Sequence, residues 1–320
     1  MNRLPFLAPI ENDLARVESI LQEHPPEQNE AIGAAIDYLV GGGGKRLRPA
    51  LALLSCRICD ASPEWAVFAA AALEMLHTAT LIHDDLIDGA LVRRGTETLN
   101  ARWTPGATVL AGDYIFARSA HLGARTGSVR FTRRFAETLM VICNGEIRQM
   151  FSQHRGAITR QEYEQRIYAK TASLIGLAAE AGAILSDADV PRTQALRTYG
   201  ERLGLAFQVV DDVLDFVADR ELLGKPVGSD LRQGLVTLPL LLFLELEPQH
   251  PLVQRTLQAF SPADVDEVVG IVAASPAIDQ ALEIAASYCE QARSALTIFP
   301  PGVYHTALLE LVDFTIRRQF

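Results

Sequence analysis

The sequence predicts an all-α protein, a single large helical bundle that forms one domain over residues 1–320. Three observations predict this fold class. Apolar residues recur at the helical spacing of about 3.6 residues along most of the chain, and alternating, strand-like patterns are almost absent. The breaks between helical runs are short. With 320 residues, 49% of them hydrophobic and 21% charged, the chain can bury a large core.

Ten or more helices are expected along the chain. The first four are the runs ENDLARVESILQEH, EQNEAIGAAIDYLV, RPALALLSCRICD and PEWAVFAAAALEMLHTATLIHDDLID. The next are expected over residues 107–126, 130–154, 160–184, 193–220 and 233–245, with three or four more up to TIRRQF. Gly and Pro mark breaks between them, at residues 41–44, 62–63, 104–106, 190–191 and 224–226.

Composition and charge exclude several classes of function. A formal net charge of -10 argues against a nucleic-acid-binding protein, which would carry a basic patch. The N-terminal MNRLPFLAPIENDLARVE lacks the pattern of a secretory signal. The apolar runs at 66–76 and 235–246 are shorter than the roughly 20 residues that cross a bilayer. We therefore expect a cytoplasmic protein without a transmembrane segment.

Two acidic clusters stand out because apolar residues surround them. The first, in LIHDDLID, contains Asp84, Asp85 and Asp88, and the second, in FQVVDDVLDF, contains Asp211, Asp212 and Asp215. In each cluster the first and last aspartates lie four residues apart and share a helical face. Helices this apolar are mostly buried, and buried carboxylates need cations as partners. Because the pattern occurs twice, a metal site explains it better than a solvated acidic face.

The ligand type indicates which metal. Carboxylate oxygens alone suit Mg²⁺, which completes its shell with water and phosphate oxygens, so a diphosphate substrate is expected. The C-x-x-C of Cys56 and Cys59 lies in a helical run and predicts buried thiols. A di-iron site would need two Glu-x-x-His pairs. Glu74 and His77 form one, but the only other spans a proline.

Basic residues suited to phosphate lie outside these clusters. GGGGKRLRP places Lys45, Arg46 and Arg48 at the start of a helix, where the helix dipole favours anions. Arg93 and Arg94 follow the first acidic cluster within a few residues, and guanidinium groups bind phosphate oxygens in pairs. His77 and His83 are expected to be hydrogen-bonded interior residues rather than metal ligands.

Lys170 and Thr171 lie in the apolar run IYAKTASLIGLAAEAGAIL, where the lysine has no partner near in sequence. A lysine that extends its chain to the surface is one explanation. In view of the acidic clusters, we favour a lysine that faces a substrate cleft.

These motifs together resemble the trans-isoprenyl diphosphate synthase (polyprenyl synthetase) family, in particular the bacterial medium- and long-chain enzymes. The matching pieces occur in the family's order over roughly residues 41 to 240 and are GGGGKRLRP, HDDLID with RRG, AGDYIFARS, AKTASL, FQVVDDVLDF and GKPVGSDLRQGLVTLPL. The resemblance implies the isoprenoid synthase fold, with helices around a deep central cavity, and a homodimer. It also implies head-to-tail condensation of isopentenyl diphosphate with an allylic diphosphate.

The resemblance assigns roles to individual residues. Up to three Mg²⁺ ions per active site are implied, held by Asp84, Asp85, Asp88, Asp211, Asp212 and Asp215. The allylic diphosphate is implied to contact Arg93, Lys170, Thr171, Gln208 and Lys225. Isopentenyl diphosphate is implied to contact Lys45, Arg48, His77 and Arg94. Catalysis is assigned to Asp84, Asp85, Asp88, Lys170, Asp211 and Asp212, which assist departure of the diphosphate.

One position departs from the family pattern, and one region bears on product length. Leu235 stands where the family commonly has lysine, so a phosphate contact is missing or comes from another residue such as Arg232. Ala79 and Thr80 lie roughly 6 to 7.5 Å below Asp84 along its helix. In this family bulky aromatic residues there resemble a plug, whereas these two are small. A geranylgeranyl or longer product is expected.

Leu76 and Leu73 are candidate lower floors of the product tunnel. Two alternatives stay open. A class I terpene cyclase shares the first acidic motif, although its second metal site typically mixes Asn, Ser and Glu. A non-catalytic subunit that binds prenyl diphosphate within a hetero-oligomer would fit the loss at Leu235, but all six aspartates are present.

Overall fold

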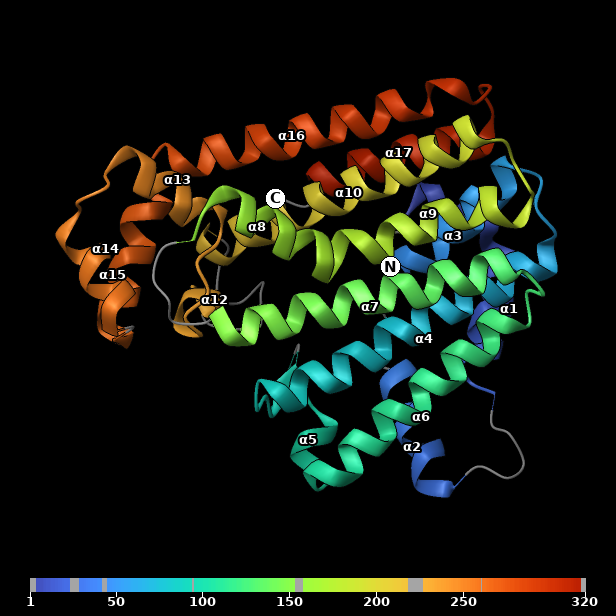
Figure 1. Cartoon of the computed structure of the whole chain (residues 1–320), viewed down its shortest axis with the longest axis horizontal. Helices are drawn as coiled ribbons and strands as arrows, with labels where there is room; N and C mark the ends of the chain where they lie inside the picture. The colour runs from blue at the N-terminus through green and yellow to red at the C-terminus, as the bar shows by residue number, and fades with distance from the viewer. Residues whose placement is uncertain are drawn as a thin grey trace. The chain divides into compact units, whose positions relative to one another are not determined.

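The protein is all-α, with one short hairpin, in the part of the chain that the structure describes (Figure 1). This computed structural model describes residues 4–23, 29–41, 45–93, 95–152, 158–217, 227–259 and 261–317, and the side chains of Val40 and Ser152 are excepted. The hairpin pairs β1 (Val92–Arg93) with β2 (Thr96–Glu97) in antiparallel register, Val92 opposite Glu97. The predicted fold class is confirmed.

The elements before residue 125 begin with a 3₁₀ turn and continue as helices. They are η1 (Pro5–Ile10), α1 (Glu11–Leu21), α2 (Glu30–Gly41), α3 (Leu47–Ile58), α4 (Pro63–Ile87), α5 (Leu99–Arg102) and α6 (Pro105–Ala124). Proline occupies the first turn of both α4 and α6, where a missing N–H costs no hydrogen bond.

The later elements are helices with one π segment and one 3₁₀ turn among them. They are α7 (Val129–Ser152), α8 (Arg160–Ile167), η2 (Tyr168–Ala172), α9 (Ser173–Leu185), α10 (Val190–Val217), α12 (Ser229–Arg232), α13 (Leu238–Leu246), α14 (Pro251–Ala259), α15 (Pro262–Ala273), α16 (Ala277–Ala295), η3 (Leu296–Ile298) and α17 (Val303–Arg317).

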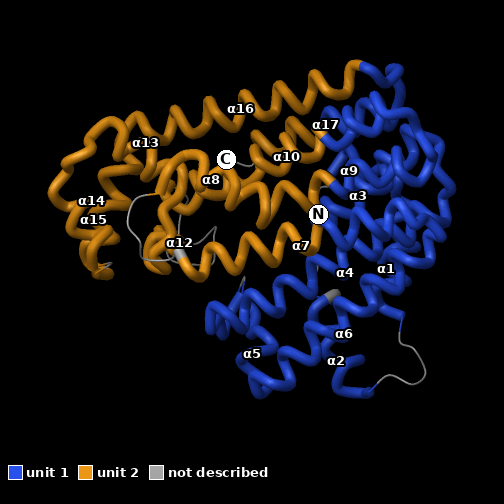
Figure 2. The backbone as a smooth tube through the Cα atoms, in the orientation of Figure 1, with its two compact units in different colours: residues 1–137, 177–197, 298–310 blue, residues 138–176, 198–297, 311–320 orange. Residues whose placement is uncertain are grey.

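The chain divides into two compact units (Figure 2). Unit 1 comprises residues 1–137, 177–197 and 298–310, and unit 2 comprises residues 138–176, 198–297 and 311–320. Four helices, α7, α9, α10 and α17, contribute residues to both. The single domain expected over residues 1–320 stays a prediction.

Unit 1 is organised around α4, which packs against α1, α3 and α6. Its alanine run, Ala69–Ala72, is fully buried, so neighbouring helices approach its backbone closely. Ser119 on α6 uses this approach and donates its hydroxyl to the Ala72 carbonyl at 2.7 Å. The end of α4 that carries the first acidic motif is therefore attached to a rigid core.

Unit 2 has a core of aliphatic side chains from α8, α10, α13, α15 and α16. Val209 and Val213 on α10 are almost fully buried there, together with Leu240 on α13 and Val268 on α15. The second acidic motif belongs to the same stretch of α10, so its carboxylates lie beside this core.

Two helix boundaries differ from the sequence-based expectation. The helix expected over 233–245 begins only at Leu238, because Gly234 adopts a left-handed conformation (φ +77°) and ends a preceding turn. The helix expected over 160–184 is interrupted by the π segment η2. Its start agrees, since Thr159 and Glu162 form a reciprocal capping box at α8.

One described helix, α4, is long and apolar enough to cross a membrane by length and composition. The bent pair α15 and α16 passes the same test only if taken as one broken span. Of the apolar window in α4, 72% is buried inside the protein, which is typical of the core helix of a globular protein.

Candidate active site

The first acidic motif lies at the C-terminal end of α4 in unit 1. Asp84 is half-buried, Asp88 is exposed and caps the helix, and Asp85 is 7% exposed. Asp85 accepts a 2.7 Å hydrogen bond from Arg93 Nε, which lies on β1. The motif therefore offers Asp84 and Asp88 on one helical face, while Asp85 already has a cation as partner.

The hairpin that carries Arg93 is attached to the end of α4. The Ala90 N–H donates to the Asp85 carbonyl at 2.8 Å, and the Thr98 hydroxyl donates to the Ala90 carbonyl at 2.7 Å. Burial raises the pKa of Asp85, and the hydrogen bond and charge of Arg93 oppose that rise. Arg94, predicted to bind isopentenyl diphosphate, lies outside the described residues.

The basic residues before α3 have different surroundings. Arg46 adopts a left-handed conformation (φ 47°) and pairs with Glu18 at 2.5 Å and Glu74 at 2.9 Å. Burial lowers the pKa of Arg46, but these two carboxylates reverse the shift and raise it overall. Lys45 is exposed and Arg48 is half-buried. Arg46 thus anchors the start of α3, and Lys45 and Arg48 stay predicted phosphate ligands.

The two histidines of α4 are both half-buried. His83 Nε2 lies 3.5 Å from the Val109 carbonyl and 3.5 Å from Asp113 Oδ1. A Cβ atom on Gly112 of α6 would lie 2.3 Å from that nitrogen, so only glycine leaves room for this ring. The close approach of α6 at Gly112 therefore makes room for the His83 ring, which is 35% exposed and so only partly interior.

The second acidic motif lies in α10 of unit 2 and is more deeply buried. Asp211 is half-buried, whereas Asp212 is 2% and Asp215 is 3% exposed. Asp212 accepts hydrogen bonds from the Tyr163 hydroxyl at 2.7 Å and from Gln208 Nε2 at 2.9 Å. Burial and the charge of Asp230 raise the pKa of Asp212 to about 7, which these two donors oppose.

Asp215 connects α10 to the start of α12. Its carboxylate accepts a hydrogen bond from the Ser229 hydroxyl at 2.8 Å and another from the Asp230 N–H at 3.1 Å. The Gly228 N–H donates to the Asp215 carbonyl at 2.7 Å. Because Asp230 lies in the first turn of α12, the Asp215 carboxylate also meets the positive end of that short helix.

The lysine-threonine pair lies on the π segment η2, a rare conformation often found at functional sites. Two glycines bring neighbouring helices close to it. A Cβ on Gly145 of α7 would lie 2.4 Å from the Ala169 side chain, and one on Gly204 of α10 would lie 2.6 Å from Ala172 Cα. The segment is therefore held between the backbones of α7 and α10.

The side chains of the pair have distinct partners. Lys170 Nζ lies 3.1 Å from Glu146 Oε1 on α7, and the lysine side chain is 38% exposed. Thr171 is buried and donates its hydroxyl to Gln208 Oε1 at 2.6 Å. Thr171, Gln208 and Asp212 thus form one hydrogen-bonded chain within unit 2, and Lys170 lies beside its start.

The motif that follows α10 is described only in part. Lys225, predicted to bind the allylic substrate, lies outside the described residues. Leu235 is half-buried, and Arg232 pairs with Asp266 on α15. Arg232 is thus engaged within unit 2, which weakens the suggestion that it replaces the missing family lysine.

The predicted chain-length residues lie one to two turns before Asp84. Ala79 is 2% exposed, Leu76 is fully buried, and Thr80 is half-buried with its hydroxyl donated to the His77 carbonyl at 2.8 Å. Thr80 is the more accessible of the two small residues. Their role in product length stays a prediction.

The number of accessible carboxylates in each acidic motif fits what Mg²⁺ needs from a protein. Among the described residues, no group of three or more His, Cys, Asp or Glu could hold a metal ion by itself. Mg²⁺ needs only one or two carboxylates when water and substrate phosphates complete its shell. Asp84 with Asp88 in unit 1, and Asp211 in unit 2, are the accessible carboxylates for that role.

Three side chains that contact the predicted site were not expected from the sequence. Tyr163 donates to Asp212, Ser229 donates to Asp215, and Glu146 pairs with Lys170. In a helix over residues 160–184, Tyr163 lies two turns before Lys170 and on the same face, so the spacing indicates that Tyr163 lies near the site. Glu146 is brought near by the close approach at Gly145, and no spacing in the sequence indicates it.

Comparison with known proteins gives the family. A family model described as polyprenyl synthetase matches residues 29–274. The all-trans-nonaprenyl-diphosphate synthase (geranyl-diphosphate specific) of Rhodobacter capsulatus is 35% identical over 98% of this chain and 97% of its own. Heptaprenyl diphosphate synthase component 2 of Geobacillus stearothermophilus is 36% identical over 97% of both chains.

A solved structure agrees with these sequence matches. It is a polyprenyl synthase from Caulobacter crescentus CB15 complexed with calcium and isoprenyl diphosphate. The TM-score is 0.92 with 36% identity, and the match covers 99% of this chain and 98% of the other.

Proposed function

Because the chain belongs to the polyprenyl synthetase family, we propose that its two acidic motifs bind Mg²⁺ and an allylic diphosphate. The chain is a prenyltransferase that makes trans-polyprenyl diphosphates. One observation carries the assignment of the site. Both DDxxD motifs are complete in this chain, and both lie within the matched residues 29–274.

We propose that Asp84, Asp88 and Asp211 contribute the accessible metal ligands, with Asp85, Asp212 and Asp215 completing the acidic motifs. Bound Mg²⁺ would neutralise charge on the departing diphosphate. The side chains of Arg93, Lys170, Thr171, Gln208 and Lys225 bind the same diphosphate. Lys45, Arg48, His77 and Arg94 bind isopentenyl diphosphate. Lys170 exchanges its ion pair with Glu146 for phosphate oxygens when substrate binds.

The reaction requires little covalent chemistry from the protein. The allylic carbon–oxygen bond breaks, and the electron pair leaves with the diphosphate. The isopentenyl double bond then attacks the allylic cation, and a proton passes to the departing diphosphate. Cationic side chains stabilise the leaving charge, and apolar walls keep water from the cation.

The product is proposed to be geranylgeranyl diphosphate or a longer prenyl diphosphate. The relatives named above are heptaprenyl and nonaprenyl diphosphate synthases. The small side chains of Ala79 and Thr80 are consistent with a long product, because neither is an aromatic plug. The geranyl-diphosphate specificity in one relative's name makes geranyl diphosphate the first primer to test.

A homodimer is proposed from an apolar face on α7. The side chains of Met140, Ile147, Met150 and Phe151 are 64%, 53%, 49% and 75% exposed. Their spacing of seven, three and one residues places them along one side of the helix. Light scattering of the purified protein tests the dimer, and Ile147→Glu should weaken it. Val303→Glu, which alters an exposed valine (60%) on α17, is the control.

A second subunit is an alternative requirement that one comparison favours. The Geobacillus relative is named component 2, which indicates that it works with another component. The cyclase alternative has no comparable support. Purified protein that elongates primers alone would exclude a need for a partner subunit.

We propose the cytoplasm as the place of action, and fractionation of cells tests this. The four cysteines are free thiols, as expected in a reducing compartment.

The decisive experiment is an elongation assay. The purified protein is incubated with Mg²⁺, isopentenyl diphosphate and each allylic diphosphate in turn, and the products are sized by chromatography. Geranylgeranyl or longer products would support the proposal. Cyclic products would support the cyclase alternative, and no elongation with any primer would contradict a synthase that works without a second subunit.

A further inference from the structure

Tyr163 on α8 is a fully buried tyrosine whose hydroxyl reaches the second acidic motif. It is 1% exposed, and its hydroxyl donates to Asp212 Oδ2 at 2.7 Å. The roles drawn from the acidic and basic motifs leave this residue without a function. A buried phenol needs some acceptor, so the bond alone does not distinguish a core residue from a functional one.

The direction of the hydrogen bonds around Asp212 favours a functional role for Tyr163 over a role in the core alone. Thr171 donates to Gln208 Oε1 at 2.6 Å, so the amide nitrogen of Gln208 faces Asp212 and donates to Oδ1 at 2.9 Å. Asp212 therefore receives one donor on each carboxylate oxygen, from Gln208 and from Tyr163. A carboxylate has about four acceptor positions, and two donors fix its plane while leaving two positions open.

The tyrosine itself is held in place from several sides. The Arg166 guanidinium lies 5.6 Å from the centre of its ring and donates to the Val236 carbonyl. The capping box of Thr159 and Glu162 begins the same helix. Tyr163 therefore approaches Asp212 from a rigid position, which a positioning role requires.

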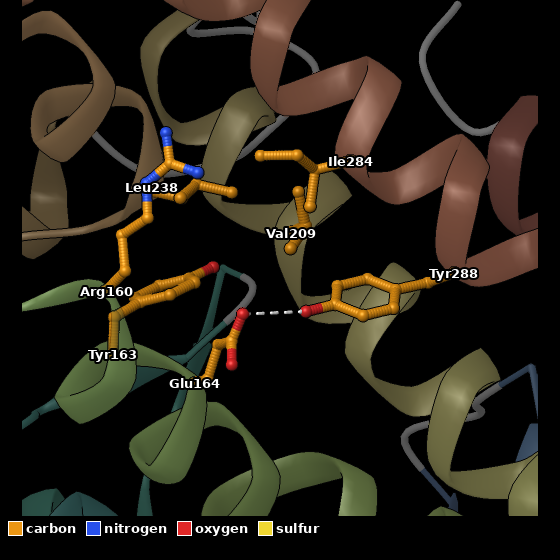
Figure 3. A pocket seen from close by; sticks show the side chains of 7 residues that line it. All are labelled: Arg160, Tyr163, Glu164, Val209, Leu238, Ile284 and Tyr288. Atoms are coloured by element: carbon orange, nitrogen blue, oxygen red, sulfur yellow. Dashed lines mark hydrogen bonds between the residues drawn. The ribbon is translucent and has the colours of Figure 1, made fainter. Parts of the chain in front are cut away.

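A small pocket lies beside the Tyr163 ring (Figure 3). Its volume of about 20 Å³ holds about one water molecule, so it is no substrate site. Tyr288 lines the same pocket, but its hydroxyl donates to Glu164 Oε1 at 3.1 Å. Two tyrosines thus share one pocket, and only Tyr163 contacts an acidic motif.

We propose that Tyr163 is a positioning residue that fixes the Asp212 carboxylate, together with Gln208, so that the second acidic motif binds Mg²⁺ and diphosphate. This inference rests on the proposed function. Asp211 precedes Asp212 directly, so a fixed Asp212 also limits rotation of the turn that presents Asp211. Partners of metal-binding side chains commonly alter metal affinity by about 10- to 100-fold when removed.

The test compares Tyr163→Phe with Tyr288→Phe. Each variant removes one hydroxyl from a tyrosine that lines this pocket. Calorimetry measures binding of Mg²⁺ with inorganic pyrophosphate, and steady-state kinetics gives the Mg²⁺ concentration for half-maximal rate. Tyr163→Phe should weaken the binding of Mg²⁺ with pyrophosphate by about tenfold, and it should raise the Mg²⁺ concentration for half-maximal rate by the same factor. It should leave the KM for isopentenyl diphosphate unchanged, and Tyr288→Phe should match the wild-type protein. Equal Mg²⁺ and pyrophosphate binding by the two variants would overturn the inference.

A double-mutant cycle tests whether Tyr163 acts through Asp212. In an Asp212→Asn background, Tyr163→Phe should cause no further loss of pyrophosphate binding, and a full additional tenfold loss would contradict the proposal. If Tyr163→Phe does not fold, Gln208→Met removes the other donor, and wild-type binding by that variant would also contradict it. Wild-type protein that binds Mg²⁺ and pyrophosphate but never elongates would count against the proposed function alone.

Discussion

The two acidic motifs share the pattern DDxxD but differ in how the protein holds their carboxylates. In the first, the last aspartate, Asp88, is exposed at the end of α4. In the second, the equivalent Asp215 is 3% exposed and accepts hydrogen bonds from Ser229 and Asp230. The first motif therefore has freedom to adjust to a ligand, whereas the second is held rigid by its own unit.

The middle aspartates show the same contrast. Asp85 meets a guanidinium from a short hairpin, and the Arg93 side chain is 40% exposed. Asp212 meets two neutral donors, Tyr163 and Gln208, inside the protein. An ion pair with one partly exposed partner is more readily exchanged than a hydrogen bond inside the protein, which is costly to break. One sequence pattern thus occurs once in an adaptable form and once in a preorganised form.

The largest effect is expected when one accessible carboxylate of each motif is neutralised. Asp84→Asn and Asp211→Asn should each lower kcat by about 100-fold or more. Each removes a proposed ligand of the Mg²⁺ that would neutralise charge on the leaving diphosphate. Circular dichroism spectra should remain those of the wild type. A near-normal rate for either variant would contradict a metal-binding role for that motif.

A smaller effect is expected from Gly204→Ala on α10. Its new Cβ would lie 2.6 Å from Ala172 Cα and push the π segment away, at a cost of about 1–3 kcal/mol in the free energy of unfolding. The affinity for pyrophosphate should fall as well, because Lys170 and Thr171 move with the segment.

The matched control for that variant is Gly270→Ala on α15, where a Cβ meets nothing within 4 Å. It should raise the free energy of unfolding by about 0.5–1 kcal/mol, since alanine favours a helix. Urea unfolding measures both variants. Equal stability of the two would show that the π segment has room to adjust.

Stability should also separate Asp215 from Asp88. Asp215→Asn places an amide nitrogen where an oxygen accepts a buried hydrogen bond, so the free energy of unfolding should fall by about 1–3 kcal/mol. Asp88→Asn should change it by less than about 0.5 kcal/mol, because Asp88 is exposed. Urea unfolding without Mg²⁺ measures both, and similar losses would contradict the difference in rigidity.

The smallest expected change concerns product length rather than rate. Ala79→Phe on α4 should shorten the product, because a bulky ring about one and a half turns before Asp84 would supply the plug that the small residue lacks. Thr78→Phe, one residue earlier and also on α4, turns to a different side of the helix and should leave the products unchanged. Chromatography of the products measures both. An unchanged distribution for Ala79→Phe would place the growing chain along another face.

Much of this molecule could be predicted from its sequence. The helix expected over 63–88 is α4, Pro63–Ile87, because its proline start and continuous apolar pattern are local features. The π segment could not be predicted, since it depends on the close approach of α7 and α10 at Gly145 and Gly204. Periodicity describes one helix at a time, whereas such contacts join residues that are far apart in the chain.

The same limit applies to the site. The two acidic motifs were evident from spacing, but their different burial depends on partners such as Tyr163, 49 residues before Asp212. Arg46 has the same charge as its neighbours Lys45 and Arg48, and only the structure shows that it pairs with Glu18 and Glu74. Spacing indicates which chemistry is present, and tertiary contacts decide which atoms remain available for it.

The π segment has a consequence for how the gene can change. A π turn contains one residue more than an α-helical turn would, and each residue of an α-helix rotates the chain by about 100°. Loss of a single codon within Tyr168–Ala172 would convert the π turn to an α-helical turn, and the helices on either side, α8 and α9, would keep their faces. Only residues inside the segment would move, and Lys170 and Thr171 belong to it. A one-residue deletion here should therefore preserve the fold while it displaces this pair from Glu146 and Gln208.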